Sequence, residues 1–319
     1  MKFIVGFFSV LISFQAMSFD YEQFAEENFR KLDNTITVQI IRSTYPLDWS
    51  SSRSLLWSIF KNKYWFPKTS STIGHVTTEV NCTIGENKVR LFSGQAVENL
   101  MDFQTKIREG YGFSILNSPE QYQELPLVTV PGRLNNLAEM KVKFDRQESR
   151  GNLNIVSFKV NREQCLSSYL FIREYIRKTQ NTPAAGNIYG FGASANKFQG
   201  AGCAPFVQTV LSRAELPEVS QQMLQTIAVP EPIVGNPKLE KRVKLSALLL
   251  NDYPLDGRYS GQVVSFSFPD PEKLYEYITQ NLNSNSKLAS KKLSGENNWY
   301  LLLDRELKEN LDVDSEASL

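Results

Sequence analysis

Strands and the turns between them give the clearest pattern in the first half of this 319-residue chain. Residues 35–41, 70–82 and 153–160 follow the strand pattern of alternating side-chain faces, with a period of two. Residues 85–87, Gly-Glu-Asn, predict a turn, and residues 88–93 are the returning strand of the hairpin that this turn would close. Further strands are expected at residues 127–130, 141–144, 262–268 and 299–303.

Apolar positions at helical spacing mark the other elements. They recur every three or four residues in 163–178 and again after Cys203, so both segments are predicted to be helices. Residues 48–59 indicate a loop that leads into a short helix, and Asp270-Pro271 is a typical helix start. Because the helices are interspersed among more numerous strands, the sequence predicts an α+β fold.

The first 18 residues have the pattern of a secretory signal peptide. Lys2 precedes an apolar run from Phe3 to Phe14, and small residues follow at the expected cleavage site. The run is shorter than the ~20 residues that a membrane helix needs, which makes an uncleaved anchor the lesser alternative. We therefore expect an exported protein, periplasmic or secreted, without stable membrane insertion once the signal is removed.

The mature chain is expected to have one main domain and an extension. Residues 19–225 form the main domain and carry the candidate chemistry. Residues 226–319 hold too few elements to bury a core alone, so we expect them to pack on the same domain. Within this extension, residues 281–294 indicate a surface loop, and the residues from about 304 an acidic, disordered tail.

Charge and the scarcity of metal ligands exclude several classes of function. Lys and Arg number 35 against 34 Asp and Glu, so no basic footprint argues for a nucleic-acid partner. One histidine and three cysteines cannot assemble a multi-histidine zinc centre or a cluster with four cysteine ligands. We expect no metal site and no cofactor, and any imidazole chemistry must use His75.

Three cysteines in an oxidising compartment leave at least one without a partner in the same chain. Cys82 and Cys165 are the pair that we expect to form a disulfide. The alternative is that all three are buried thiols that behave as small apolar side chains.

Cys203 has the sequence surroundings of a nucleophile. It begins a predicted helix, where unsatisfied N–H groups and the helix dipole stabilise a thiolate. Gly200 and Gly202 in the preceding loop let a substrate backbone approach, and their amides, with Gln199 beside them, would help to form an oxyanion hole. His75 is the one imidazole that could serve as the base for this thiol.

His75 on a strand is followed, 128 residues later, by the segment 200–207, Gly-Ala-Gly-Cys-Ala-Pro-Phe-Val. This order resembles the circularly permuted branch of the papain-like superfamily, which includes permuted NlpC-type amidases and lecithin–retinol acyltransferase-like proteins. In that branch the histidine strand precedes the cysteine helix. The resemblance covers roughly residues 70–214. It implies a permuted papain-like fold, with Cys203 as nucleophile, His75 as base and a polar third residue on the next strand that orients the imidazole.

The third residue must lie across the hairpin from His75. Glu79 is on the same strand face but about 13 Å along it, which is beyond hydrogen-bond reach. With the turn near Glu86, Gln95 and Glu98 fall within a residue or two of the required position. We choose Gln95, because an amide accepts from the imidazole N–H without adding charge.

The expected function is an exported, cofactor-free cysteine hydrolase, a peptidase or amidase that cleaves an amide bond through an acyl-enzyme. Its expected substrate is a peptide of the cell-wall or peptidoglycan type. The alternatives are a non-catalytic binding or structural protein on the same fold, and an acyltransferase acting on a lipid. The hydrolase predicts an exposed Cys203 of low pKa, the binding protein a buried and inert one, and the acyltransferase an apolar groove beside it.

Overall fold

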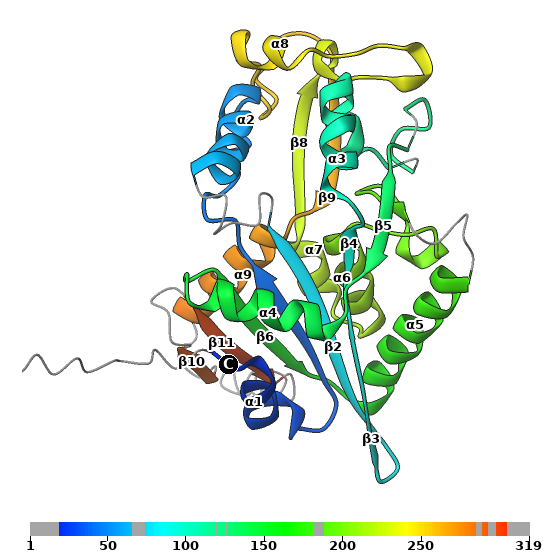
Figure 1. The fold of residues 1–319 in the computed structure, drawn as a ribbon, viewed down its shortest axis with the longest axis vertical. Coiled ribbons are helices and arrows are strands. Elements are labelled where there is room, and N and C mark those ends of the chain that lie inside the picture. The colour runs from blue at the N-terminus through cyan, green and yellow to red at the C-terminus, as the bar shows by residue number, and fades with distance from the viewer. Residues whose placement is uncertain are drawn as a thin grey trace, which may run out of the picture.

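The computed structural model of this protein describes residues 19–65, 74–118, 120–125, 127–181, 188–284, 289–292 and 298–304. The predicted signal peptide, most of the predicted acidic tail and residues 70–73 of the predicted histidine strand lie outside these residues. The described chain is a mixed α+β structure (Figure 1). No helix within the described ranges is both long enough and apolar enough to cross a membrane.

A six-stranded sheet forms the centre of the molecule, in the order β10-β11-β6-β1-β2-β3. All neighbouring strands in it run antiparallel except β11 and β6, which are parallel. Its strands are β1 (Thr35–Ile41), β2 (His75–Ile84), β3 (Asn87–Ser93), β6 (Leu153–Lys159), β10 (Ala289–Lys292) and β11 (Trp299–Asp304). The predicted strands at 35–41 and 153–160 and the predicted hairpin are confirmed.

Two small sheets accompany the large one. The first has the order β4-β5-β7, and the second pairs β8 with β9. Their strands are β4 (Gln95–Val97), β5 (Val130–Leu134), β7 (Ile188–Tyr189), β8 (Leu224–Pro230) and β9 (Val263–Pro269). In Figure 1, β8 and β9 extend away from the large sheet toward the end of the molecule that carries α8.

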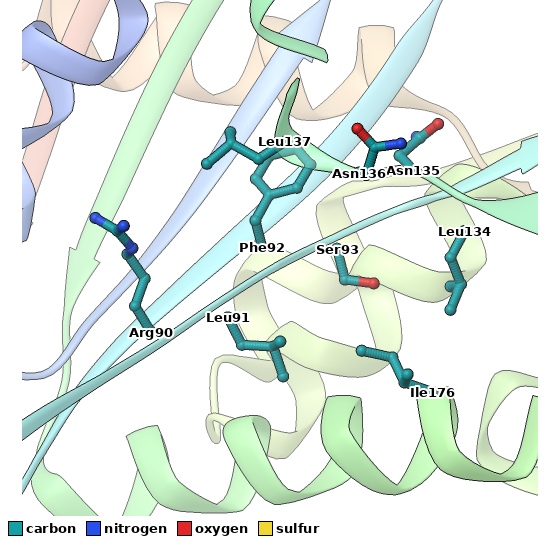
Figure 2. A pocket seen from close by; sticks show the side chains of 9 residues that line it. All are labelled: Arg90, Leu91, Phe92, Ser93, Leu134, Asn135, Asn136, Leu137 and Ile176. Carbon is teal, nitrogen blue, oxygen red and sulfur yellow. The ribbon is translucent and has the colours of Figure 1, made fainter. Parts of the chain in front are cut away.

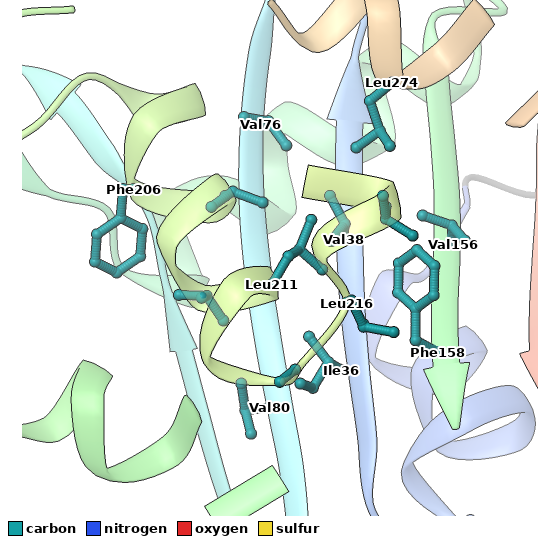
Figure 3. Close-up of a cluster of buried hydrophobic side chains, with 14 of the residues drawn as sticks. Ile36, Val38, Val76, Val80, Val156, Phe158, Phe206, Leu211, Leu216 and Leu274 are labelled. Carbon is teal, nitrogen blue, oxygen red and sulfur yellow. The ribbon is translucent and has the colours of Figure 1, made fainter. Parts of the chain in front are cut away.

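Helices cover both faces of the large sheet. On one face, α5 and α6 bury apolar side chains of β1, β2 and β6. Figure 3 shows side chains of α6 against these three strands. On the other face, aromatic side chains of α1 and α4 pack against β1 and β6. The helices are α1 (Tyr21–Ala25), α2 (Ser52–Phe60), α3 (Leu100–Lys106), α4 (Leu137–Glu148), α5 (Arg162–Asn181), α6 (Cys203–Arg213), α7 (Pro217–Gln222), α8 (Leu245–Leu250) and α9 (Pro271–Ser284).

Strand β2 is fixed on both of its faces. On the face toward α5, Cys82 and Cys165 form a disulfide, the pairing expected from the sequence. On the opposite face, Glu79 is fully buried and accepts hydrogen bonds from Arg30, at 2.5 and 3.0 Å, and from the Tyr21 hydroxyl at 3.0 Å. The Tyr21 hydroxyl in turn accepts a 2.7 Å bond from Gln39 of β1. The segment just after the predicted signal peptide is thereby tied to the centre of the sheet.

Three predicted elements differ from the structure. Residues 141–144 lie in α4 and not in a strand, because Leu137, Met140 and Phe144 recur at helical spacing and the Asn136 side chain caps the helix. The strand expected at 127–130 begins only at Val130. The predicted loop at 281–294 instead contains the end of α9 and strand β10, which pairs with β11.

Glu79→Gln should destabilise the fold strongly, because it removes the fully buried carboxylate that pairs with Arg30 and leaves this cation with its more exposed partners Glu22 and Glu26. We expect the free energy of unfolding, measured by urea denaturation, to fall by about 3–5 kcal/mol. The matched control is Glu120→Gln, which removes an exposed ion pair with Lys197 and should cost less than about 1 kcal/mol. Equal losses in the two variants would show that the buried pair does not hold the sheet.

Candidate active site

His75 begins β2 and is buried, with 7% of its surface exposed. Its Nε2 atom lies 2.7 Å from the side-chain Nδ2 of Asn135. With the amide in this orientation, Asn135 donates to Nε2 and the ring proton is on Nδ1. With the amide turned over, its oxygen accepts from Nε2–H and leaves Nδ1 free to take a proton. In either orientation, Asn135 fixes the plane and tautomer of the only imidazole in the chain.

Asn135 reaches the imidazole because the chain leaves the large sheet at Gly94, between the end of β3 and the start of β4. Strand β4 then pairs with β5, and Asn135 directly follows β5. The β2–β3 ladder ends at the pair Thr78 and Ser93, and the Asn135 N–H then donates to the Gly94 carbonyl at 2.8 Å. A Cβ atom on Gly94 would lie 2.7 Å from Thr77 Cγ2 and 3.1 Å from Asn135 Nδ2. A residue without a side chain is therefore required where β5 delivers Asn135 to the end of β2.

Gln95 is not the hydrogen-bond partner of His75, which corrects the expectation from the sequence. It lies on β4, opposite Leu134 of β5. Its side chain is buried, and within the described part of the chain its Oε1 atom has no hydrogen-bond partner. The expected register continued β3 past Ser93, but the chain turns into a different sheet there. The alternative, Glu98, lies beyond β4, where its N–H donates to the Pro131 carbonyl.

Cys203 is the first residue of α6, as predicted, and follows the N-cap Gly202. It is the free cysteine of the described chain and is buried, with 5% of its surface exposed. The hydroxyl of Tyr189, on β7, lies 3.6 Å from its Sγ atom. Burial raises the pKa of the thiol, whereas the Tyr189 hydroxyl and the backbone amides of Val76 and Ala204 act in the opposite direction.

The thiol and the imidazole approach the same end of β2. The Val76 amide that faces the thiol belongs to the residue directly after His75. In the described structure the imidazole contacts Asn135 and the thiol contacts Tyr189, and no hydrogen bond joins Sγ to the imidazole. The site therefore brings Cys203, His75 and Asn135 to one edge of the sheet, with Tyr189 beside the thiol.

Both groups are neutral in this environment. The pKa of His75 lies well below its usual value of 6.5, first because of burial and then because of the positive charges of Lys143 and Arg133. The Lys143 charge also lowers the pKa of Cys203, but burial outweighs it. A buried, neutral thiol and a buried, neutral imidazole differ from the low-pKa, exposed thiol that the hydrolase hypothesis predicted from the sequence.

The loop before α6 packs closely against β7. A Cβ atom on Gly200 would lie 2.2 Å from the Ile188 carbonyl oxygen, and this glycine has a φ of +95°, which other residues rarely adopt. The Ala201 N–H donates to the same carbonyl at 3.2 Å. Gln199 is exposed. Gly200 thus holds the loop against the strand that carries Tyr189, whereas Gly202 lies against the Pro205 ring, and the amide between the two glycines is already used.

A pocket of about 540 Å³ is lined by Asn135 together with residues of β3, the start of α4 and α5. Figure 2 shows Leu91, Ser93 and Leu134 on one side of it with Ile176 of α5 opposite. The Ser93 hydroxyl is buried and has no hydrogen-bond partner among the described residues. The residue that orients the imidazole therefore also borders a hollow with both polar and apolar walls.

Metal ligation and similarity to known proteins add nothing to this picture. In the described ranges, no three His, Cys, Asp or Glu side chains lie close enough together to hold a metal ion. Comparisons of the chain with protein-family models, with curated proteins and with solved structures find no significant match. The case for a function rests on the arrangement of the residues described above.

The buried, neutral His75 should make the fold sensitive to acid. The unfolded imidazole binds a proton below about pH 6.5 while the folded one does not, so stability falls as the pH drops through that value. In His75→Gln the loss between pH 7.5 and pH 5 should be smaller by about 2 kcal/mol. Urea denaturation at the two pH values measures it.

A second buried group, Asp270, changes stability with pH in the opposite direction to His75, but it does not affect this comparison. Burial raises the pKa of the Asp270 carboxyl to about 6, so its contribution to stability is complete at low pH and declines as the pH rises toward 6. Asp270 is present in both proteins, and its contribution cancels in the comparison. The same pH dependence in wild type and His75→Gln would contradict a neutral, buried imidazole.

Proposed function

We propose that this protein is a cysteine hydrolase that cleaves an amide bond, with Cys203 as nucleophile, His75 as general base and Asn135 as the residue that orients the imidazole. The observation that carries the proposal is the 2.7 Å contact between Asn135 and His75 Nε2. It occurs at the end of β2 where the Val76 amide faces the free thiol. A nucleophile, a base and a group that orients the base are the elements of this type of catalysis.

The proposed reaction uses Asn135 in the orientation that accepts from Nε2–H. His75 Nδ1 then takes the Cys203 proton as the sulfur attacks the carbonyl carbon of the substrate. The resulting imidazolium gives this proton to the leaving amine when the C–N bond breaks, which leaves an acyl-enzyme. Water, activated by the neutral imidazole, hydrolyses the thioester and restores the thiol.

Tyr189 and the start of α6 supply polarity where negative charge develops. The Tyr189 hydroxyl is already within 3.6 Å of Sγ, and burial keeps it protonated by raising its pKa. The N-terminus of α6 presents its unsatisfied N–H groups and the positive end of the helix dipole to the thiol. In a buried site such donors stabilise an oxyanion more strongly than they would in water.

The raised pKa of Cys203 favours one of two forms of this mechanism. A thiolate–imidazolium pair in the resting enzyme would require a low thiol pKa. Here burial raises the pKa of the thiol and lowers that of the imidazole, which favours proton transfer during the attack itself. The resting site is closed over the sulfur, so substrate binding must open it.

The same burial is the observation that favours a second candidate function. A non-catalytic exported protein on this fold would keep Cys203 as a small core residue among Val76, Ala204 and Val207. Such a protein has no need for an oriented imidazole, and the contact between His75 and Asn135 would then be purely structural.

The fold and the substrate class belong to the same proposal. In the chain, the strand that begins at His75 precedes the helix that begins at Cys203, and this helix packs on the sheet that contains the strand. This order supports the permuted papain-like arrangement. The predicted export of the chain supports a peptide of the cell wall, or a peptidoglycan fragment, as the source of the amide bond.

Hydrolysis of soluble muropeptides by the chain that begins at Phe19 tests the proposal. We expect mass spectrometry to detect one new amine per cleaved amide, and Cys203→Ala to abolish it. Asn135→Ala should lower kcat by about 10- to 100-fold, with KM nearly unchanged, because it disturbs the tautomer of His75 and not substrate binding. If Gln95→Ala lowers kcat instead, Asn135 is not the orienting residue.

Alkylation separates the two candidate functions when the true substrate is absent from the screen. Because the resting site is closed over the sulfur, iodoacetamide should label Cys203 slowly at pH 7.5, but still at least ~10-fold faster in wild type than in His75→Ala, since the imidazole takes the thiol proton whenever the site opens. Cys82 and Cys165, joined as a disulfide, should remain unlabelled. Slow labelling of Cys203 that is indifferent to His75 would establish the non-catalytic protein.

A further inference from the structure

A group of large aromatic side chains is exposed along α2 and the helical turn η2 (Lys61–Trp65) that continues it. Trp57 is 47% exposed, Phe60 40%, Tyr64 56% and Trp65 58%. The rings contact one another, with centroids 5.3 Å apart for Trp57 and Phe60, 4.5 Å for Phe60 and Tyr64, and 6.0 Å for Trp57 and Trp65. We call these four side chains the aromatic patch. A contiguous apolar surface of this kind marks an interaction site.

The aromatic patch continues onto the leucines of α8. Arg53, one helical turn before Trp57, donates to the carbonyl oxygens of Leu249 at 2.7 Å and Leu250 at 3.1 Å. The side chains of Leu249 and Leu250 are 43% and 76% exposed. In Figure 1, α2 and α8 lie next to each other at the end of the molecule farthest from β3. Aromatic rings and exposed leucines thus share one end of the fold.

Lys and Arg outnumber acidic residues in the segments that form this surface, and of these cations Arg53 pairs with Asp252 and Lys241 with Glu231. Residues 53–65 contain three Lys or Arg and no acidic residue, and residues 238–250 contain four Lys or Arg and one acidic residue. The whole chain, by contrast, has a net charge of only +1. The Lys61 ammonium lies 4.1 Å from the Tyr45 ring, and that of Lys63 lies 5.2 Å from the Tyr64 ring. Lysine ammonium groups therefore lie directly beside the aromatic rings.

We propose that this end of the molecule, formed by α2, η2, α8 and residues 238–244, binds the surface of an anionic phospholipid membrane. Trp and Tyr rings occupy the headgroup level of a bilayer, exposed leucines reach the start of the acyl chains, and Lys and Arg pair with lipid phosphates. The complementary charge favours an anionic bilayer over an uncharged protein surface. The protein lies on the membrane and does not span it.

Membrane binding would place the candidate active site close to the bilayer. Lys63 Nζ donates to Gln104 Oε1 of α3 at 3.3 Å, and Phe103 of the same helix packs edge-on against Tyr189 at 6.3 Å. Tyr189 is the residue that contacts Cys203. The inference itself does not depend on the proposed hydrolase activity, since a binding protein could use the same surface.

Sedimentation with large unilamellar vesicles tests the proposal with the chain that begins at Phe19, which removes the apolar residues 1–18. We expect binding to vesicles that contain phosphatidylglycerol, weaker binding to pure phosphatidylcholine, and loss of binding at high salt. The double variant Trp57→Ser and Trp65→Ser should bind at least ~10-fold more weakly. Leu170→Ser on α5, which removes an equally exposed side chain, should bind like wild type.

Four results would overturn the proposal. The first is no sedimentation with either kind of vesicle at low salt. The second is equal binding to both lipids without salt dependence. The third is a loss of binding in Leu170→Ser equal to that in the double variant. The fourth is retention on isolated cell-wall glycan by the aromatic patch without vesicle binding, which would assign the surface to a polysaccharide. Circular dichroism of each variant confirms that the serine substitutions leave the fold intact.

Discussion

The buried carboxylate of Glu79 is the constraint on which the rest of this structure depends. A charge at the centre of a sheet is tolerated only with a close partner, and Arg30 and Tyr21 provide the contacts. Those partners come from the segment directly after the predicted signal peptide, so the sheet is complete only when that segment has folded onto it. On the other face, the disulfide of Cys82 anchors the same strand to α5. Strand β2 is therefore fixed independently of any substrate.

A strand fixed in this way can present reactive groups at its free edge. The ladder with β3 stops at Ser93, and the end of β2 is left open to Asn135 from one side and to the Cys203 thiol, through the Val76 amide, from the other. Burial then keeps both titratable groups neutral. The proposed function builds on this: in it, the imidazole is oriented before a substrate arrives, and the proton moves only during the attack.

The sequence predicts the parts of this arrangement that have a strong period and misses the part that depends on a change of sheet. Strand β2, its hairpin and helix α6 follow from local patterns, and so do the positions of His75 and Cys203. Asn135 does not, because its approach requires the chain to leave β3 at Gly94 and pair with a strand some 40 residues later. The isolated Gly94 between two strand segments was the available signal. The short Lys-Val-Lys-Phe alternation at 141–144 misled for the opposite reason, since the helical period needs a longer window.

The tautomer of His75 is the most direct test of the central claim, and a chain with one histidine gives a single imidazole signal. In a long-range ¹H–¹⁵N correlation spectrum at pH 7, the account predicts a neutral ring with its proton on Nε2, donated to Asn135, and Nδ1 unprotonated. It also predicts that this signal does not titrate until well below pH 6.5. A proton on Nδ1, or titration near 6.5, would mean that Asn135 does not prepare His75 as a base and would contradict the account.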